Sequence, residues 1–315
     1  MRRAGSTDMS SSNAGALVAP QQVQQNPVSI FYGFSAFNET VTVLEVPQHP
    51  PSGLQQFAGA RLLLLDATGN LHSVWREHEV LTGSCWDLLA SLPALVPQGP
   101  LALLGLGAGT VPRISAKYFP GCMYHGWELD PTVVMAARIY LGMDQLEKEG
   151  ALVCHIDDAL TVASQGLELP VFSGVVVDLF AKGQLLPELT QASTWQSIRQ
   201  LLSGSPAGAR VLVNLGEAPP RTAGQRWTPE ALTSMAALEA MREVWDGQVS
   251  VMHYQDSDIA NNLMALTGPC PSPAEMQASL PEGLQHVGQQ CPWTDGSELF
   301  ALLAGEDKRR QLSQK

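Results

Sequence analysis

The chain has 315 residues, of which 45% are hydrophobic, and it carries a formal net charge of −12. This is enough for one large domain with appendages or for two modest domains. The negative charge argues against nucleic acid as a partner, and the absence of a run of about 18 apolar residues argues against a membrane. Five scattered cysteines and seven histidines without ligand spacing predict neither a disulfide framework nor a metal site.

The first segment, residues 1–27, is rich in serine and glutamine and too poor in apolar residues to build a core. We therefore expect a disordered tail. Two localisations stay open. The scattered cysteines favour a reducing compartment and a cytoplasmic protein. The alternative is a plastid or a mitochondrion, reached through a short transit segment, because the tail contains two arginines, several serines and one acid.

Residues 28–95 have the pattern of a small antiparallel β module followed by a helix. Residues Glu39–Val46 alternate and are rich in β-branched side chains, which is typical of a strand. Residues Arg61–Asp66 and Leu71–Trp75 are two apolar runs on either side of a glycine-containing turn, which predicts a hairpin. Apolar residues recur at helical spacing between Thr82 and Leu92.

Residues 96–268 alternate strand and helix patterns, which predicts an α/β fold with a doubly wound, seven-stranded, Rossmann-like sheet. Residues 269–315 are rich in proline and glycine and read as a C-terminal extension with a short helix over Ser297–Leu303. The predicted strands are Leu101–Leu104, Met123–Glu128, Leu152–Ile156, Gly174–Asp178, Ala209–Asn214, Val249–Met252 and Asn262–Thr267. The main predicted helices follow Gly109 and cover Val133–Leu141, Gln191–Leu202 and Thr228–Val244.

A glycine-rich turn follows the first of these strands and carries the strongest indication of function. Gly105, Gly107 and Gly109 free the backbone for a tight turn and for the close approach of a ligand. The next helix directs its unpaired N–H groups into that turn. The second strand ends in Glu128, about 20 residues later, where an acid can accept both hydroxyls of a ribose. The pattern predicts a nucleoside-binding βαβ unit.

The spacing of the glycines indicates which nucleoside is bound. A dinucleotide-binding turn would need glycine or alanine at position 110, where this chain has Thr110. Gly-x-Gly-x-Gly followed by a glutamate is the pattern of S-adenosylmethionine-dependent transferases. A nicotinamide oxidoreductase and a turn whose glycines serve only packing stay open as alternatives.

Other acids also follow predicted strands. Because ligands bind beyond the carboxyl ends of parallel strands, we expect these residues at one edge of the sheet. Asp178 is also the candidate catalytic residue, since a carboxylate there could take the proton of an amine nucleophile. Capping the next loop or binding the cofactor's amine are equally open roles. The candidate cofactor-binding residues are Gly105, Gly107, Gly109, Glu128, Asp130, Asp158, Ala159 and Asp178.

Over residues 38–267 the sequence resembles the polyamine aminopropyltransferases, the spermidine and spermine synthase family within the class I S-adenosylmethionine-dependent methyltransferase superfamily. The most specific part is the segment from the Leu-Leu-Leu-Asp66 strand through Leu71–Glu77 to a helix ending at Pro93, just before the glycine turn. The resemblance implies S-adenosylmethionine or its decarboxylated form as co-substrate. It also implies a small-molecule acceptor such as a polyamine, and a homodimer.

The nucleoside half of the family's site is matched. By this resemblance Glu128 binds the ribose, Asp158 meets the adenine amino group, and Asp178 is the first acid of the catalytic Asp-x-x-Asp loop.

The diamine half departs from the family. Ala181 replaces the second acid of the loop, Ala108 replaces the acid that meets the aminopropyl group, and Cys85-Trp86-Asp87 replaces a diamine-binding tyrosine segment. Asp87, Asp178, Asp256 and Asp258 could compensate for part of the loss. We expect a spermidine synthase-like transferase that moves a methyl or aminopropyl group to a small amine, with poor or no aminopropyl transfer to putrescine. The alternative is a non-catalytic nucleoside-binding homologue that serves as a partner or regulatory subunit.

Overall fold

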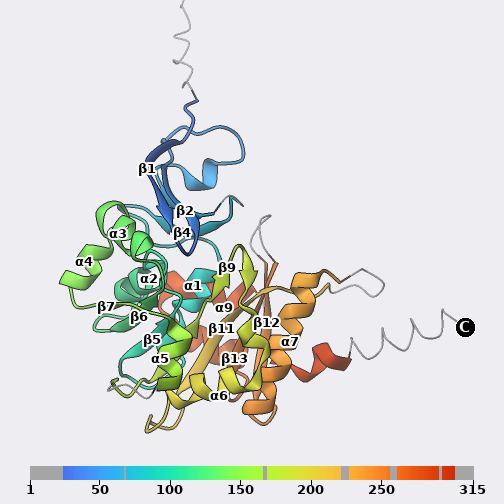
Figure 1. The fold of residues 1–315 in the computed structure, drawn as a ribbon. Helices are drawn as coiled ribbons and strands as arrows, with labels where there is room; N and C mark the ends of the chain where they lie inside the picture. Colours follow the sequence, from blue (N-terminus) through green and yellow to red (C-terminus); the bar gives the residue numbers. More distant parts are fainter. Residues whose placement is uncertain are drawn as a thin grey trace, which may run out of the picture.

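The computed structural model describes residues 24–66, 69–165, 169–220, 227–255, 261–290 and 293–301. Most of the expected N-terminal tail lies outside these ranges. The described residues form a small sheet that sits on one end of a larger α/β body (Figure 1).

The small sheet confirms the predicted antiparallel β module. Its described part has four strands in the order β1-β2-β3-β4, each antiparallel to the next. They are β1 (Val28–Ser35), β2 (Glu39–Glu45), β3 (Arg61–Leu65) and β4 (Leu71–Trp75). Sequence analysis did not predict β1. Its apolar residues do not alternate cleanly, and Gly33 interrupts them, so β1 depends on pairing with β2 rather than on a buried face of its own.

The main sheet confirms the predicted doubly wound arrangement. Its described residues form eight strands in the order β14-β12-β13-β11-β8-β5-β6-β7. The neighbouring strands β11, β8, β5, β6 and β7 are parallel to one another, and β13 is antiparallel to both of its neighbours, β11 and β12. Their bounds are Leu101–Leu104 (β5), Tyr124–Glu128 (β6), Leu152–Ile156 (β7), Gly174–Val177 (β8), Arg210–Glu217 (β11), Val249–Gln255 (β12), Asn261–Thr267 (β13) and Thr294–Asp295 (β14).

The seven predicted strands are all present, and β14 adds a two-residue edge strand from the C-terminal extension. The strand order reverses between β5 and β8, which is where ligands bind in open α/β sheets. The glycine turn after β5 and Asp178 after β8 therefore lie on the two sides of this switch point.

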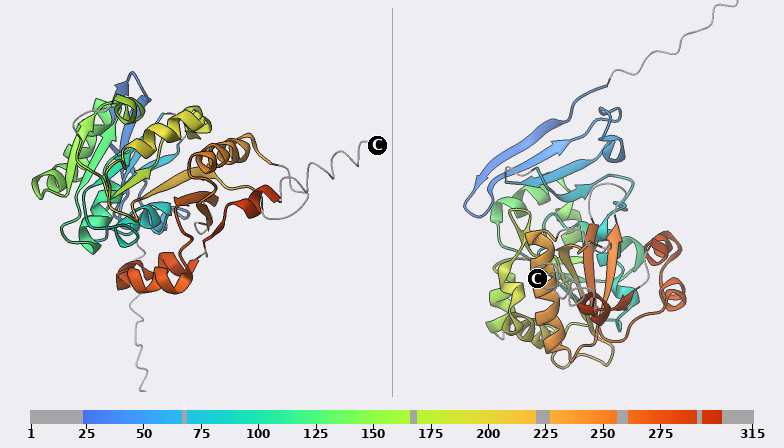
Figure 2. Two further views of the ribbon diagram at one scale, coloured as in Figure 1. Left: turned by 90° about the horizontal axis from the view of Figure 1, so that it is seen from below. Right: turned by 90° about the vertical axis from the view of Figure 1, so that its right-hand side faces the viewer.

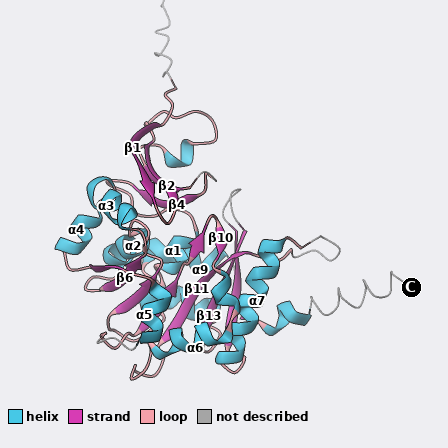
Figure 3. Ribbon diagram, viewed as in Figure 1, coloured by secondary structure: helices cyan, strands magenta, loops and turns pink. Residues whose placement is uncertain are grey.

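Helices cover both faces of the main sheet (Figures 2 and 3). Successive residues of β5 point to opposite faces, so Leu103 joins one hydrophobic core and Leu104 the other. The first core includes α1 (Cys85–Leu89), α2 (Thr110–Tyr118), α3 (Pro131–Tyr140) and α4 (Met143–Lys148), and the second includes α5 (Ala159–Gln165), α6 (Ala192–Gln200) and α7 (Pro229–Val244). Among the described residues no helix is long and apolar enough to cross a membrane.

The segment after Gly268 contains helices that the sequence analysis did not predict. Helix α8 (Pro273–Ser279) begins with a capping box between Ser272 and Glu275, and α9 (Gln285–Gln290) follows it. Both pack on the first core, through side chains such as Met276 and Val287. Residues 297–301 are helical, in agreement with the predicted short helix as far as it is described. Short 3-10 turns occur at Gln55–Phe57 (η1), Leu92–Ala94 (η2), Pro187–Thr190 (η3) and Glu282–Leu284 (η4).

Candidate functional site

The glycine turn between β5 and α2 has the conformation that its sequence predicts. Gly105, Gly107 and Gly109 have φ values of 92°, 54° and 74°, in the left-handed region that L side chains rarely adopt. A β-carbon placed on Gly105 would lie 2.1 Å from the backbone carbonyl oxygen of Asp178. Position 105 therefore needs glycine both for its backbone angle and for the close approach of the chain after β8.

Glu128, at the end of β6, lies against this turn. Its carboxylate accepts hydrogen bonds from the N–H groups of Gly107 at 2.9 Å and Asp130 at 3.1 Å. Burial raises the pKa of Glu128 to about 7, against the opposing effect of these backbone bonds. Each oxygen has a further lone pair, so the ionised group can still accept from the two hydroxyls of a ribose.

Asp130 is held by protein donors. Its carboxylate caps α3 by accepting from the N–H of Thr132 at 2.8 Å, and it also accepts from Asn38 Nδ2 at 2.8 Å and from the hydroxyl of Ser35. Although burial acts in the opposite direction, these bonds lower the pKa of Asp130. The residue ties the end of the β1–β2 hairpin to α3, and its role in cofactor binding stays a prediction.

Asp158 and Ala159 lie at the end of β7, where α5 begins. The Asp158 carboxylate accepts from the N–H of Leu160 at 2.9 Å and from the hydroxyl of Thr161 at 3.0 Å, while the Ala159 side chain is buried. Asp158 is exposed and can turn toward a ligand.

Two large apolar side chains are exposed beside these acids. Leu129 follows Glu128, and the register of the sheet pairs Glu128 with Ile156 at the end of β7. The side chains of Leu129 and Ile156 are 45% and 49% exposed. An exposed apolar pair at the ligand edge of the sheet suits the flat face of a nucleobase. The sequence analysis missed these two residues, although a large apolar residue next to an acid at the end of a strand is a signal that could have identified them.

Asp178 directly follows β8, is partly buried and is held by two donors from distant parts of the chain. Trp86 Nε1–H donates to its Oδ2 at 3.1 Å, and Asn214 Nδ2 donates to its Oδ1 at 3.0 Å. Burial raises the pKa of Asp178, and the two hydrogen bonds oppose part of that shift. The carboxylate is therefore fixed in orientation, and the backbone of Asp178 lies close to the glycine turn.

Among the described residues, the side chains that contact the Asp178 carboxylate are uncharged. Asn214 and Asn262 both direct Nδ2 at the buried sulfur of Cys85, at distances of 3.8 Å and 3.2 Å. Thiol and amide groups thus stand where the family has a tyrosine-containing diamine pocket. The acids Asp256 and Asp258, which could compensate, lie outside the described residues.

The chain after Asp178 forms a small hairpin of β9 (Phe180–Ala181) and β10 (Gln184–Leu185). Ala181, in the place of the family's second acid, is exposed at its start. In the turn, Lys182 Nζ pairs with Glu39 Oε1 of β2 at 2.8 Å. This exposed ion pair joins the hairpin to the N-terminal module.

The N-terminal module also forms part of the site, which the sequence analysis missed. The hydroxyl of Ser73, in β4, accepts from the N–H of Ala108 at 2.9 Å. A β-carbon on Gly107 would lie 3.0 Å from that hydroxyl and 3.5 Å from the His72 carbonyl oxygen. Strand β4 therefore forms a wall against the glycine turn. From the other side, partly buried Arg113 donates to the carbonyl oxygen of Ala108 at 3.1 Å, and burial lowers its pKa to about 10.

Among the described residues there is no group of three or more histidine, cysteine, aspartate or glutamate side chains placed to hold a metal ion.

Comparisons with known proteins agree with this architecture, although no family model matches the chain. A probable spermidine synthase from Corynebacterium glutamicum has a similar structure, with a TM-score of 0.63 at 15% identity, covering 91% of this chain and 95% of that one. For the spermidine synthase of Thermotoga maritima the TM-score is 0.54 at 15% identity, covering 76% of this chain and 72% of that one.

In sequence, 132 residues are 28% identical to the human eEF1A lysine and N-terminal methyltransferase, a match over 38% of this chain and 18% of that protein. The chain thus spans less than a fifth of the curated relatives that it matches. The sequence identities to the two solved structures are low, so these similarities establish the fold alone. On these grounds the chain has the fold of the spermidine synthases, as its sequence predicts.

Proposed function

We propose that the chain is a spermidine synthase-like transferase that moves the methyl group of S-adenosylmethionine to an amine. The observation that carries this proposal is the placement of Asp178. Its partly buried carboxylate is fixed by Trp86 and Asn214, and its own backbone packs on Gly105 of the nucleoside-binding turn. A base is therefore held beside the cradle for the co-substrate.

The reaction needs little more from the protein. The amine lone pair attacks the methyl carbon, the bond from that carbon to sulfur breaks, and sulfur keeps the electron pair. The protein supplies alignment and excludes water. An ammonium acceptor must first lose a proton, and Asp178 is placed to accept it. Because burial raises the pKa of Asp178, the carboxyl is a better base than an exposed aspartate, and it loses this role as the pH falls through its raised pKa.

Two features support S-adenosylmethionine over its decarboxylated form. Ala108 carries no charge that would attract the aminopropyl amine and repel a carboxylate. Arg113 places a partly buried cation behind the same turn. Both favour a co-substrate that retains its carboxylate.

We propose that the acceptor is an amine whose reacting nitrogen carries the one positive charge in its neighbourhood, as opposed to a diamine with a second ammonium group. The described surroundings of Asp178 offer one carboxylate, together with thiol and amide groups. A second ammonium group would find no second acid at Ala181. Lysine side chains and chain N-termini are amines of this kind, and they are the acceptors that the human relative's name gives.

The deciding experiment supplies the purified protein with radiolabelled S-adenosylmethionine and separately with its decarboxylated form. Acceptors are putrescine, a lysine peptide and a peptide with a free N-terminus. We expect methyl transfer to a peptide amine and spermidine formation weaker by about two to four orders of magnitude than in a complete diamine site, from two lost charged contacts. Spermidine formation near about one per second would overturn the proposal. Binding of S-adenosylmethionine without any transfer would favour the non-catalytic homologue.

Removal of the Glu128 carboxylate tests the nucleoside half of the site. Glu128→Ala should weaken binding of methylthioadenosine by about 10- to 100-fold, or about 1.5–3 kcal/mol, because two charged hydrogen bonds to ribose are lost. Calorimetry measures the change, with Asp144→Ala on the exposed face of α4 as control. In the wild type, affinity should fall as the pH drops below about 7, where Glu128 becomes protonated. Equal affinities of Glu128→Ala and the wild type would show that the ribose does not bind at Glu128.

We also propose a homodimer formed through the N-terminal sheet. Strand β1 is an edge strand, and its Phe34 side chain is 80% exposed, with Tyr32 and Val28 exposed along it. An unpaired edge with apolar side chains is a surface that pairs with another strand. Sedimentation should give a dimer at micromolar concentration, and Phe34→Glu should give a monomer. A monomeric wild type would refute the proposal.

A further inference from the structure

The C-terminal extension makes a polar contact with helix α1, which forms part of the site. In helix α9, His286 Nε2 lies 3.5 Å from Asp87 Oδ2, and His286 Nδ1 lies 3.1 Å from the carbonyl oxygen of Gly283. Both ring nitrogens thus face acceptors. A neutral imidazole carries only one N–H, so this geometry fits the imidazolium form, which can donate to both.

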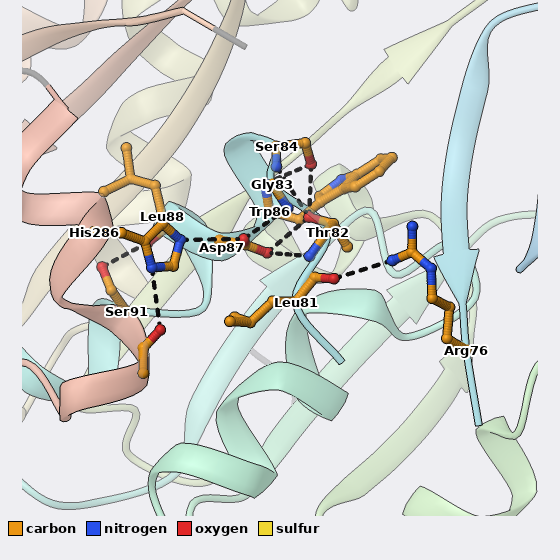
Figure 4. A network of polar contacts seen from close by, with 11 residues as sticks. Arg76, Leu81, Thr82, Gly83, Ser84, Trp86, Asp87, Leu88, Ser91 and His286 are labelled. Carbon is orange, nitrogen blue, oxygen red and sulfur yellow. Dashed lines mark hydrogen bonds and ion pairs between the residues drawn. The ribbon is translucent and has the colours of Figure 1, made fainter. Parts of the chain in front are cut away.

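Asp87 is fully buried and anchors the loop before α1 (Figure 4). Its carboxylate accepts from the N–H of Thr82 at 2.9 Å, from the Thr82 hydroxyl at 2.7 Å and from the N–H of Gly83 at 2.9 Å. Helix α1 has five residues, too few to be stable without tertiary contacts. Its position therefore depends on anchors such as this one.

The same helix supplies a donor to the candidate base. Trp86, next to Asp87, points away from His286 in Figure 4 and donates its indole N–H to Asp178 at 3.1 Å. Cys85, at the start of the helix, contacts Asn214 and Asn262. Any shift of α1 therefore changes the surroundings of Asp178.

We propose that His286 is a positioning residue whose imidazolium, paired with buried Asp87, holds α1 so that Trp86 orients the Asp178 carboxylate. The inference rests on the proposed function for the role of Asp178. The contact between the C-terminal extension and α1 is independent of it.

The contact should depend on pH. The hydrogen bond to Asp87 raises the pKa of His286, against the effect of burial. The stabilisation is present below that pKa and is lost as the pH rises through it. The other groups that face this contact are Glu79, from the loop after β4, and Tyr118 of α2, whose ring lies against Gly283. Burial and the charges of Asp87 and Glu79 raise the pKa of Tyr118, so Tyr118 stays neutral over the range in which a histidine titrates.

The test compares His286→Ala with His286→Lys, which keeps a positive charge across the pH range. His78→Ala is the matched control, because His78 is an exposed histidine that lies 4.0 Å from a likewise exposed acid, Glu77. Hydrogen exchange of residues 82–90, corrected for intrinsic rates, is measured from about pH 6 to about pH 9 together with kcat and the KM for S-adenosylmethionine.

In His286→Ala we expect exchange over residues 82–90 to rise about fivefold to tenfold, and kcat to fall by a similar factor with KM little changed. The wild type should show the same change on raising the pH, and His286→Lys should not. Unchanged exchange in His286→Ala, uniform acceleration over all peptides, or failure of lysine to restore protection would each overturn the inference. If no acceptor is methylated but exchange responds as expected, the proposed function fails while the anchoring of α1 stands.

Discussion

Replacement of Asp178 by asparagine is expected to lower kcat by at least about 100-fold, the usual minimum contribution of a positioned general base. The substitution keeps the shape of the side chain but removes its charge. It also directs an amide N–H at either Trp86 or Asn214, both of which are donors, so one of their hydrogen bonds is lost. Affinity for S-adenosylmethionine should change little, because Glu128 and the glycine turn are unaltered.

Single-turnover rates with a peptide amine, measured against pH, provide the readout. The wild-type rate should fall as the pH drops through the raised pKa of Asp178, and Asp178→Asn should lack this limb. Asp144→Asn, whose side chain forms an exposed ion pair with Lys148, controls for the loss of one negative charge. A variant with near wild-type turnover would show that the proton leaves by another route.

Replacement of Gly105 by alanine is expected to be the most destabilising change in the nucleoside half of the site. The new β-carbon would lie 2.1 Å from the carbonyl oxygen of Asp178, at a φ of 92°. Backbone strain costs about 1–2 kcal/mol and the forced separation of two packed segments costs about 1–3 kcal/mol, so the free energy of unfolding should fall by about 2–5 kcal/mol.

Gly121→Ala is a matched control for this experiment. Gly121 has a similar φ of 83°, but a β-carbon there would have no neighbour within 4 Å. It should therefore lose only the backbone term, about 1–2 kcal/mol. Urea denaturation measures both variants, and calorimetry with methylthioadenosine should show lost binding for Gly105→Ala alone. Equal losses of stability would mean that the chain after β8 can move away from the turn at little cost.

The parallel strands could be predicted because their own residues specify them. Strands β5 and β8 are apolar at every position and completely buried, so continuous hydrophobic runs identify them. Strands β1 and β14 could not be predicted, since they exist through pairing with β2 and β12 and have no buried pattern of their own.

The same contrast holds in the candidate site. Glu128 and Asp178 follow strands, and the topology of a parallel sheet brings such residues to one edge. Trp86 and Ser73 contact the site from the N-terminal segment, and Asn214 lies within β11, where it reads as an ordinary strand residue. The contact of His286 with Asp87 joins segments far apart in the chain. Local patterns do not encode such contacts.

The position of β13 within the sheet has a consequence for synthesis of the protein. Strand β12 pairs with β13 and β14 but not with β11, so it has no partner until residues 261–267 have left the ribosome. Up to that point the nascent chain exposes the open edge of β11. The contact between Asn262 and Cys85 also forms only after residues 261–267 have been synthesised. A partly made chain can therefore form the nucleoside-binding half of the sheet, whereas the acceptor half is completed only after β13 has been synthesised.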